Sequence, residues 1–117
     1  MHEMGIIASV LDVVASSAAE AGATRVTAVS LRIGEMTEAI PDALEFAFEA
    51  LTEGTICEGA QLSIEMVSPT SMCLECAKDF EHDRFHRRCP ECGSYETVIM
   101  SGRELEISSI EVDLPDE

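Results

Sequence analysis

The sequence has few basic residues, because its 117 residues include 7 lysines and arginines against 23 aspartates and glutamates. The resulting formal charge of −16 at pH 7 would repel the phosphate backbone that dominates nucleic-acid affinity. A nucleic-acid-binding role is therefore disfavoured. The acidic surface is expected to keep the protein soluble, or to help attract cations or a basic partner.

Long apolar runs are also missing, since no run approaches the roughly 20 residues that are needed to cross a bilayer. The N-terminus lacks the basic flank and the cleavage site of a secretory signal. These two absences predict a cytoplasmic protein that contacts no membrane. The sequence also lacks a glycine-rich phosphate loop and a nucleophile at a recognisable spacing from a base, so we expect a protein that is not an enzyme.

Periodic apolar residues occupy both ends of the chain. Helical spacing predicts helices over residues 3–21 and 41–51, and alternation predicts strands over residues 24–33, 62–67 and 105–112. The fold class expected from this order is α+β, with two helices packed on a small β-sheet. A four-cysteine zinc ribbon is expected as an insertion between the last two strands.

The middle segment, residues 70–101, shows neither the helical nor the strand periodicity of apolar residues, and it is rich in cysteine, arginine, histidine and glutamate. It has no apolar core of its own. We therefore expect two domains, in which residues 1–69 and 102–117 form the α+β domain and residues 70–101 form the ribbon.

Four of the five cysteines form two pairs of identical spacing, Cys73-Leu-Glu-Cys76 and Cys89-Pro-Glu-Cys92, with 12 residues between them. Disulfides are not expected in the cytosol, where thiols are kept reduced. Each CxxC turn can aim two sulfurs at one point, and four thiolates form the tetrahedron that zinc prefers. This closed coordination predicts a structural zinc ion. The fifth cysteine, Cys57, is expected to be a small buried apolar residue.

Iron in place of zinc is the main alternative, since rubredoxin uses similar paired turns. Only Phe80, Phe85 and Tyr95 are available in the segment to shield such an iron, which favours zinc. A redox role for one CxxC pair is disfavoured because neither pair lies between a strand and a helix. His82 and His86 are either exposed loop residues or groups that perturb the zinc site with pH or ligate a second metal.

The first residues, Met1-His2-Glu3, offer a second set of metal ligands. The α-amine of Met1, the deprotonated backbone nitrogen of His2 and its imidazole can chelate one ion through fused rings. Such nitrogen ligands suit square-planar Ni(II) or Cu(II), and Glu3 or a water molecule could complete the set. The alternative is an exposed histidine at the start of a helix.

Several short motifs, taken in order along the chain, resemble the hydrogenase nickel incorporation proteins of the HypA/HybF family. These motifs are Met1-His2-Glu3-Met4, Leu31-Arg32-Ile33-Gly34-Glu35, Phe46-Ala47-Phe48-Glu49, Glu53-Gly54-Thr55, the paired cysteine turns with Cys92-Gly93-Ser94, and Ser101-Gly102-Arg103-Glu104-Leu105. The combination of an N-terminal Met-His-Glu with a late four-cysteine ribbon is the most specific part of the resemblance.

The resemblance implies a nickel metallochaperone that is active in hydrogenase maturation. Ni(II) would be a transient cargo held at His2 and Glu3 and delivered to the large subunit of a [NiFe] hydrogenase. A GTPase, HypB, is the implied partner, and zinc would stay in the ribbon. We expect a monomer or a weak homodimer. The main rival hypothesis is a zinc-ribbon adaptor protein that does not transfer nickel.

Overall fold

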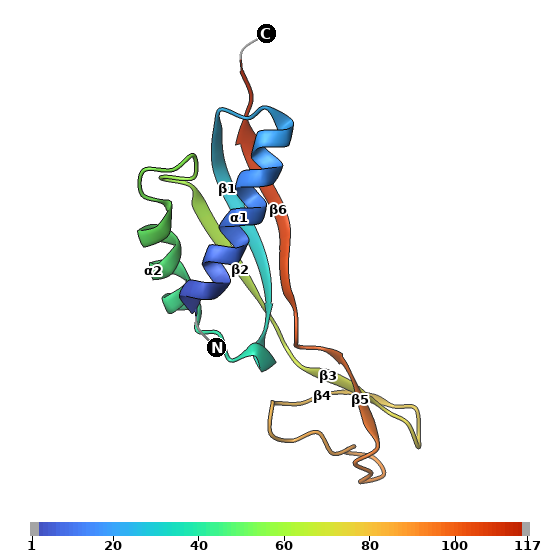
Figure 1. Ribbon diagram of the computed structural model, residues 1–117. Coiled ribbons are helices and arrows are strands. Elements are labelled where there is room, and N and C mark those ends of the chain that lie inside the picture. Colours follow the sequence, from blue (N-terminus) through green and yellow to red (C-terminus); the bar gives the residue numbers. More distant parts are fainter. Residues whose placement is uncertain (1–2, 116–117) are drawn as a thin grey trace. The chain divides into compact units, whose positions relative to one another are not determined.

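The computed structural model describes residues 3–115. Figure 1 shows the elements in chain order. They are α1 (Glu3–Ala21), β1 (Arg25–Gly34), the 3-10 helix η1 (Glu35–Thr37), α2 (Pro41–Thr52), β2 (Gln61–Val67), β3 (Thr70–Cys73), β4 (Asp79–Glu81), β5 (Thr97–Ser101) and β6 (Leu105–Asp113). The predicted α+β fold with an inserted four-cysteine module is confirmed.

The strands form two three-stranded sheets. One sheet has the order β2-β1-β6, and the other has the order β4-β3-β5. β6 runs antiparallel to β1, since the Thr24 N–H donates to the Asp113 carbonyl at 2.9 Å and the Gly34 N–H donates to the Glu104 carbonyl at 2.8 Å. In the second sheet β3 pairs antiparallel with both β4 and β5.

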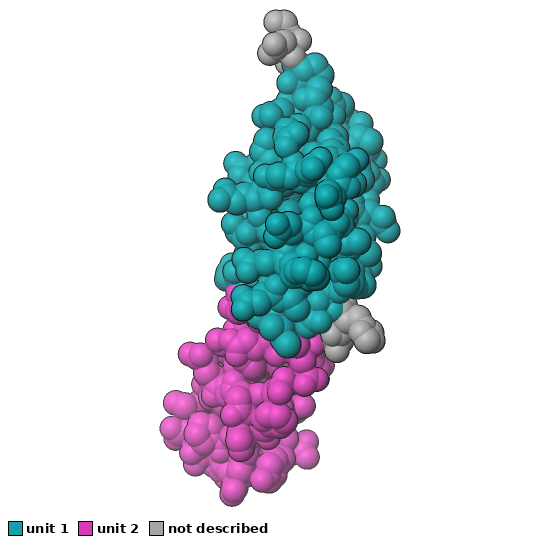
Figure 2. Space-filling model, turned by 90° about the vertical axis from the view of Figure 1, so that its left-hand side faces the viewer, with its two compact units in different colours: residues 1–31, 39–65, 106–117 teal, residues 32–38, 66–105 magenta. Residues whose placement is uncertain are grey.

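The chain divides into two compact units, which are coloured separately in Figure 2. Unit 1 contains residues 1–31, 39–65 and 106–117, and so includes both α-helices. Unit 2 contains residues 32–38 and 66–105, and so includes the sheet β4-β3-β5 and all four paired cysteines.

The core of unit 1 comes from one face of each helix and from β1. Its fully buried side chains include Ile7, Val14 and Ala18 of α1, Leu44 and Ala47 of α2, and Val26, Val29 and Leu31 of β1. α1 packs against α2. Pro41 begins α2 at a position where its missing N–H removes no helical hydrogen bond. Cys57 is buried, as expected.

α1 corrects one expectation, because its length and composition reach the range of membrane-crossing helices. Alanine raises its mean hydropathy without a continuous run of large apolar residues. Its buried residues, Ile7, Val14 and Ala18, recur at intervals of seven and four and contribute to the core of unit 1. Such a pattern is typical of an amphipathic helix that packs one face against a protein core.

Candidate metal centre

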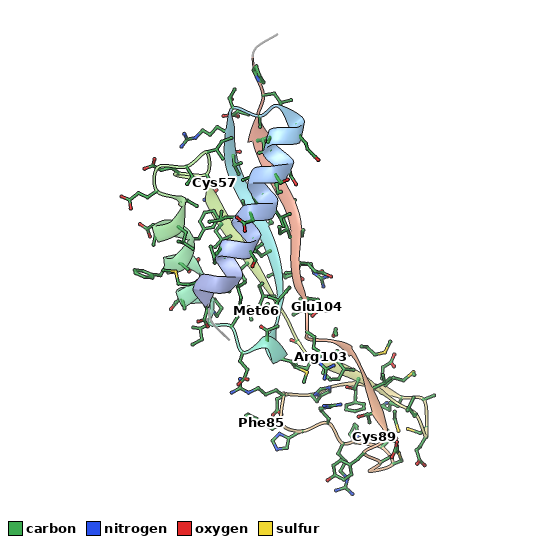
Figure 3. All side chains as sticks on the ribbon, in the orientation of Figure 1. Cys57, Met66, Phe85, Cys89, Arg103 and Glu104 are labelled. Atoms are coloured by element: carbon green, nitrogen blue, oxygen red, sulfur yellow. The ribbon has the colours of Figure 1, made fainter. Side chains whose placement is uncertain are left out.

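The four paired cysteines come together in unit 2. Cys73 ends β3 and Cys76 follows in the turn to β4, while Cys89 and Cys92 lie in the segment before β5. Their four sulfur atoms lie within 4.8 Å of one another. The Sγ atoms of Cys73 and Cys92 are 3.5 Å apart, and those of Cys76 and Cys89 are 3.6 Å apart. Figure 3 labels Cys89 in this part of the chain.

These separations fit a zinc ion. Zn–S bonds of about 2.3 Å in a tetrahedron place neighbouring sulfurs about 3.8 Å apart, close to the two separations above. The donor set is four soft sulfur ligands, which zinc accepts and which leave no open position for a water molecule. The cluster is therefore suited to holding a zinc ion rather than to hydrolysis.

The two cysteine turns have the same backbone conformation. The Ala77 N–H donates to the Cys73 carbonyl at 2.9 Å, and the Gly93 N–H donates to the Cys89 carbonyl at 3.0 Å. The residue after each second cysteine is left-handed, with φ of +62° at Ala77 and +75° at Gly93. Glycine adopts this conformation readily, whereas a residue with a Cβ does not. The motif Cys92-Gly93-Ser94 thus has glycine where the conformation requires it, whereas the first turn has Ala77 at the equivalent position.

Substitution at these two positions is expected to have opposite effects. Ala77→Gly relieves backbone strain and should raise the free energy of unfolding of the ribbon by about 0.5–1 kcal/mol. Gly93→Ala introduces strain and places a Cβ 2.8 Å from the Arg88 guanidinium, so it should lower that free energy by about 1–2 kcal/mol. Both changes in free energy are measured by chemical unfolding of the zinc-bound protein, with the NMR signals of residues 70–101 as the readout. Equal effects of the two variants would contradict the equivalence of the turns.

Hydrogen bonds make the thiols of Cys89 and Cys76 unequal before a metal is bound. Hydrogen bonds from the backbone N–H groups of Cys92 and Glu91 stabilise the Cys89 thiolate and lower the pKa of Cys89 to about 7, although burial acts in the opposite direction. The Lys78 N–H favours the Cys76 thiolate and so lowers the pKa of Cys76. The hydrogen bond shared with Cys89, together with desolvation, outweighs this effect and raises that pKa to about 12. One sulfur therefore ionises while a neighbour keeps its proton. A divalent cation would replace the protons that the cluster shares.

The apolar core around the cluster is small. The buried residues that form it are Cys73, Phe80 and Cys89. Ser71, on β3 beside Phe80 of β4, is also buried but polar. Two of the three core residues are thus the proposed metal ligands themselves, which agrees with the expectation that this segment lacks an apolar core of its own.

The two loop histidines differ from each other. Nε2 of His82 lies 2.7 Å from the hydroxyl of buried Ser71, and its Nδ1 lies 2.6 Å from the Asp83 carbonyl. A carbonyl oxygen only accepts, so Nδ1 donates to Asp83, whereas the contact between Nε2 and the Ser71 hydroxyl can run in either direction. His86 is exposed and its Nδ1 lies 2.8 Å from the Asp83 carboxylate, a contact that lowers the pKa of Asp83. Among residues 3–115 the metal-binding cluster contains neither histidine.

The N-terminal ligand set falls partly beyond the part of the chain that the structure describes. His2 lies outside the described residues, whereas Glu3 begins α1. The Glu3 carboxylate accepts a hydrogen bond of 3.0 Å from the Ile40 N–H. Ile40 is the N-cap of α2 and has no capping side chain of its own, so Glu3 satisfies an N–H that would otherwise lack a helical partner. Sequence reasoning missed this contact because 37 positions separate the two residues.

Two motifs that carried the family resemblance meet in unit 2. The Gly34 N–H donates to the Glu104 carbonyl, and the Met36 N–H donates to the Gly102 carbonyl, each at 2.8 Å. The Gly102 N–H in turn donates to the Glu104 carboxylate at 2.8 Å. Figure 3 labels Arg103 and Glu104 at this point of the chain. The backbone around Gly34 and that around Gly102 are therefore held in direct contact.

The fold and the cluster define a small metal-binding protein with an α+β unit and a four-cysteine ribbon. The family model described as hydrogenase/urease nickel incorporation metallochaperone, HypA, matches residues 1–112. The hydrogenase maturation factor HypA of Geobacter metallireducens is 43% identical over 113 residues, which cover 97% of this chain and 100% of that protein. The factor of the same name from Chlorobium luteolum is 41% identical, with 97% of each chain covered. The chain belongs to the HypA family.

Solved structures agree with this assignment. The solution structure of the Ni metallochaperone HypA from Helicobacter pylori matches with a TM-score of 0.71 and 25% identity, over 98% of this chain and 100% of that one. A second solution structure of a HypA protein matches with a TM-score of 0.72 over 96% of both chains. The resemblance drawn from the sequence motifs is confirmed.

Proposed function

We propose that this chain is a nickel metallochaperone that binds Ni(II) at its N-terminus and delivers it to the large subunit of a [NiFe] hydrogenase during maturation. The observation that carries the proposal is the match to the HypA family over residues 1–112, which include the Met1-His2-Glu3 sequence. A carrier must release its ion, so the nickel site is expected to bind more weakly than the zinc site. The chemistry is ligand exchange, and no catalytic role is proposed.

The proposed ligands of Ni(II) are His2, through its imidazole and backbone nitrogen, and the α-amine of Met1, with Glu3 as a further ligand. Nitrogen ligands in one plane suit Ni(II), and their geometry rather than raw affinity must supply selectivity. The hydrogen bond from the Ile40 N–H to Glu3 fixes the first turn of α1. It supports the proposal because the backbone that follows His2 is then held in one place, which lowers the entropy lost on binding.

Zinc is proposed as a resident structural ion of Cys73, Cys76, Cys89 and Cys92. In this assignment residues 1–69 and 102–117 form the nickel-binding domain, and residues 70–101 form the zinc-binding ribbon domain. The sulfur separations near 3.5 Å support it, since protonated thiols gain little from such close packing unless a cation joins them.

The proposed partners are a hydrogenase-maturation GTPase related to HypB and the large subunit of the hydrogenase. We propose a cytoplasmic location and no binding to nucleic acid or membrane, with the chain as a monomer or a weak homodimer. The strongly acidic composition supports the absence of nucleic-acid binding.

Nickel binding should weaken as the pH falls. Binding requires an unprotonated amine, a neutral imidazole and a deprotonated amide, so each bound ion displaces protons. Because the ligand-free state binds more protons than the nickel-bound state, acid favours the free state. Nickel affinity is expected to fall by more than about tenfold between about pH 8 and pH 6. Calorimetric titration measures it, and an affinity that stays constant over this range would contradict the ligand set.

Transfer tests the proposal as a whole. The nickel-loaded chain is incubated with the nickel-free large subunit and the partner GTPase, and nickel in the separated large subunit is measured by mass spectrometry. Faster loading than from free Ni(II) at the same concentration is expected. Loading at the rate of free Ni(II), despite nickel bound to the chain, would reject delivery and favour a zinc-ribbon adaptor.

A further inference from the structure

We propose that the groove between α2 and the start of β2 is a docking surface for a basic, extended segment of a partner protein. The groove has a volume of about 820 Å³ and lies within unit 1. Glu45, Phe46, Glu49 and Glu53 line it on the helix side, and residues 58–62 line it on the strand side. Figure 2 shows the face of unit 1 on which α2 lies. This inference goes beyond the proposed nickel function, since it requires no metal.

The helix side of the groove carries uncompensated negative charge. Glu45 and Glu49 lie four residues apart on α2 and Glu53 follows as its C-cap, and all three line the groove as one acidic stripe. Like charges four residues apart on a helix repel each other, so Glu45 and Glu49 lower the intrinsic stability of α2. Among residues 3–115 no ion pair of these three carboxylates is found.

The rest of unit 1 does not supply the missing positive charge. Its described residues, 3–31, 39–65 and 106–115, contain twelve acidic residues and one basic residue, Arg25. The guanidinium of Arg25 donates to the backbone carbonyl of Glu58, and the Glu58 carboxylate accepts from the Gly54 N–H at 3.3 Å. A partner that fits this groove must therefore bring its own lysine or arginine side chains.

An apolar anchor lies beside the charged stripe. Phe46 is a large apolar side chain on α2, and 69% of its surface is exposed. Leu62, on the strand side of the same groove, is half-buried. Exposed aromatic side chains that border a concave surface are typical contact points of protein interfaces. The groove thus offers an apolar contact flanked by carboxylates.

The strand side favours an extended occupant. β2 lies at the edge of the sheet β2-β1-β6, so among the described residues no strand pairs with its outer side. Extended segments commonly add to such an edge through main-chain hydrogen bonds. A segment that pairs with the start of β2 would direct every second side chain toward α2. Among those side chains, apolar ones would contact Phe46 and basic ones would approach the glutamate stripe.

The test uses the zinc-bound full chain, labelled with ¹⁵N, and a synthetic peptide in which every second position carries in turn valine or leucine and lysine or arginine, so that one face of the extended peptide presents both kinds. We expect the peptide to shift the amide signals of α2 and of residues 58–64, and its acidic counterpart to shift none. Binding should weaken roughly fivefold or more in Glu49→Gln/Glu53→Gln, because two charge contacts are lost. Phe46→Ala, at an exposed position, should weaken binding without changing the fold.

The matched control is Glu20→Gln/Glu111→Gln, which has the same net charge but changes other faces of unit 1. It should leave the peptide affinity unchanged. Equal weakening in both double variants would show non-specific attraction to net charge and overturn the proposal, as would the absence of peptide binding. If magnesium alone shifted the same amide signals, the groove would be assigned to cations and the proposal would be overturned. It would also be overturned if the shifts depended on protein concentration alone, because the groove would then bind a second copy of the chain.

Discussion

Removal of zinc with a strong chelator is expected to unfold residues 70–101 while α1 and α2 keep their helical structure. The core of this segment consists of Cys73, Phe80 and Cys89. Burial of one phenylalanine side chain contributes only about 1.5–3 kcal/mol, whereas zinc contributes about 10–16 kcal/mol to the folding of small zinc-binding peptides. A zinc ion held by the four cysteines would therefore be the dominant stabilising contribution in the ribbon.

Amide NMR signals separate the two regions in one experiment. After chelation the signals of residues 70–101 should collapse to the narrow range of an unfolded segment, and added zinc should restore them. Cys76→Ser should show the collapse without a chelator. Cys57→Ala is the control, because Cys57 is buried in unit 1 and lies outside the cluster. Dispersed signals from residues 70–101 in metal-free protein would contradict this account of the ribbon.

Gly34→Ala is expected to lower the stability of unit 2 by about 3 kcal/mol or more. The conformation of Gly34, with φ of −74° and ψ of 141°, is open to any residue, so the requirement for glycine is one of space. A Cβ at this position would overlap the carbonyl of Gly102 and lie 2.5 Å from the Arg103 nitrogen. Backbone atoms cannot rotate away as the end of a flexible side chain can.

A second glycine provides the matched control for this variant. A Cβ at Gly5 of α1 would meet no atom within 4 Å, so Gly5→Ala should stabilise the protein by roughly 0.5–1 kcal/mol through helix propensity. Thermal unfolding followed by circular dichroism measures both variants. The midpoint of the Gly34→Ala variant should fall by more than about 10 °C. A midpoint within a few degrees of the wild type would mean that the contact between the backbones at Gly34 and Gly102 is not required.

The regular elements of unit 1 could be predicted because their periodicity is strong. Helical spacing placed the first helix over residues 3–21, where α1 is observed, and the second from Pro41, where α2 begins. Alternation predicted the strands that became β1, β2 and β6. The paired cysteines could be predicted to come together because a CxxC turn constrains both of its sulfurs.

Contacts between distant parts of the sequence could not be predicted. The strands β3, β4 and β5 are only 3–5 residues long and carry no clear alternation of apolar residues. The contact of His82 with Ser71, and the cap that Glu3 provides at Ile40, depend on tertiary structure alone. The strain at Ala77 could have been found by aligning the two cysteine turns, since Gly93 fills the matching position.

Metal stoichiometry of the chain with a native, untagged N-terminus tests the central claim most directly. Zinc content and nickel titration are measured for the wild type and for His2→Ala. The proposal predicts one zinc ion per chain in both proteins and one further Ni(II) bound by the wild type alone. Equal nickel binding by both proteins would contradict an N-terminal site, and no nickel binding by either would contradict a nickel metallochaperone.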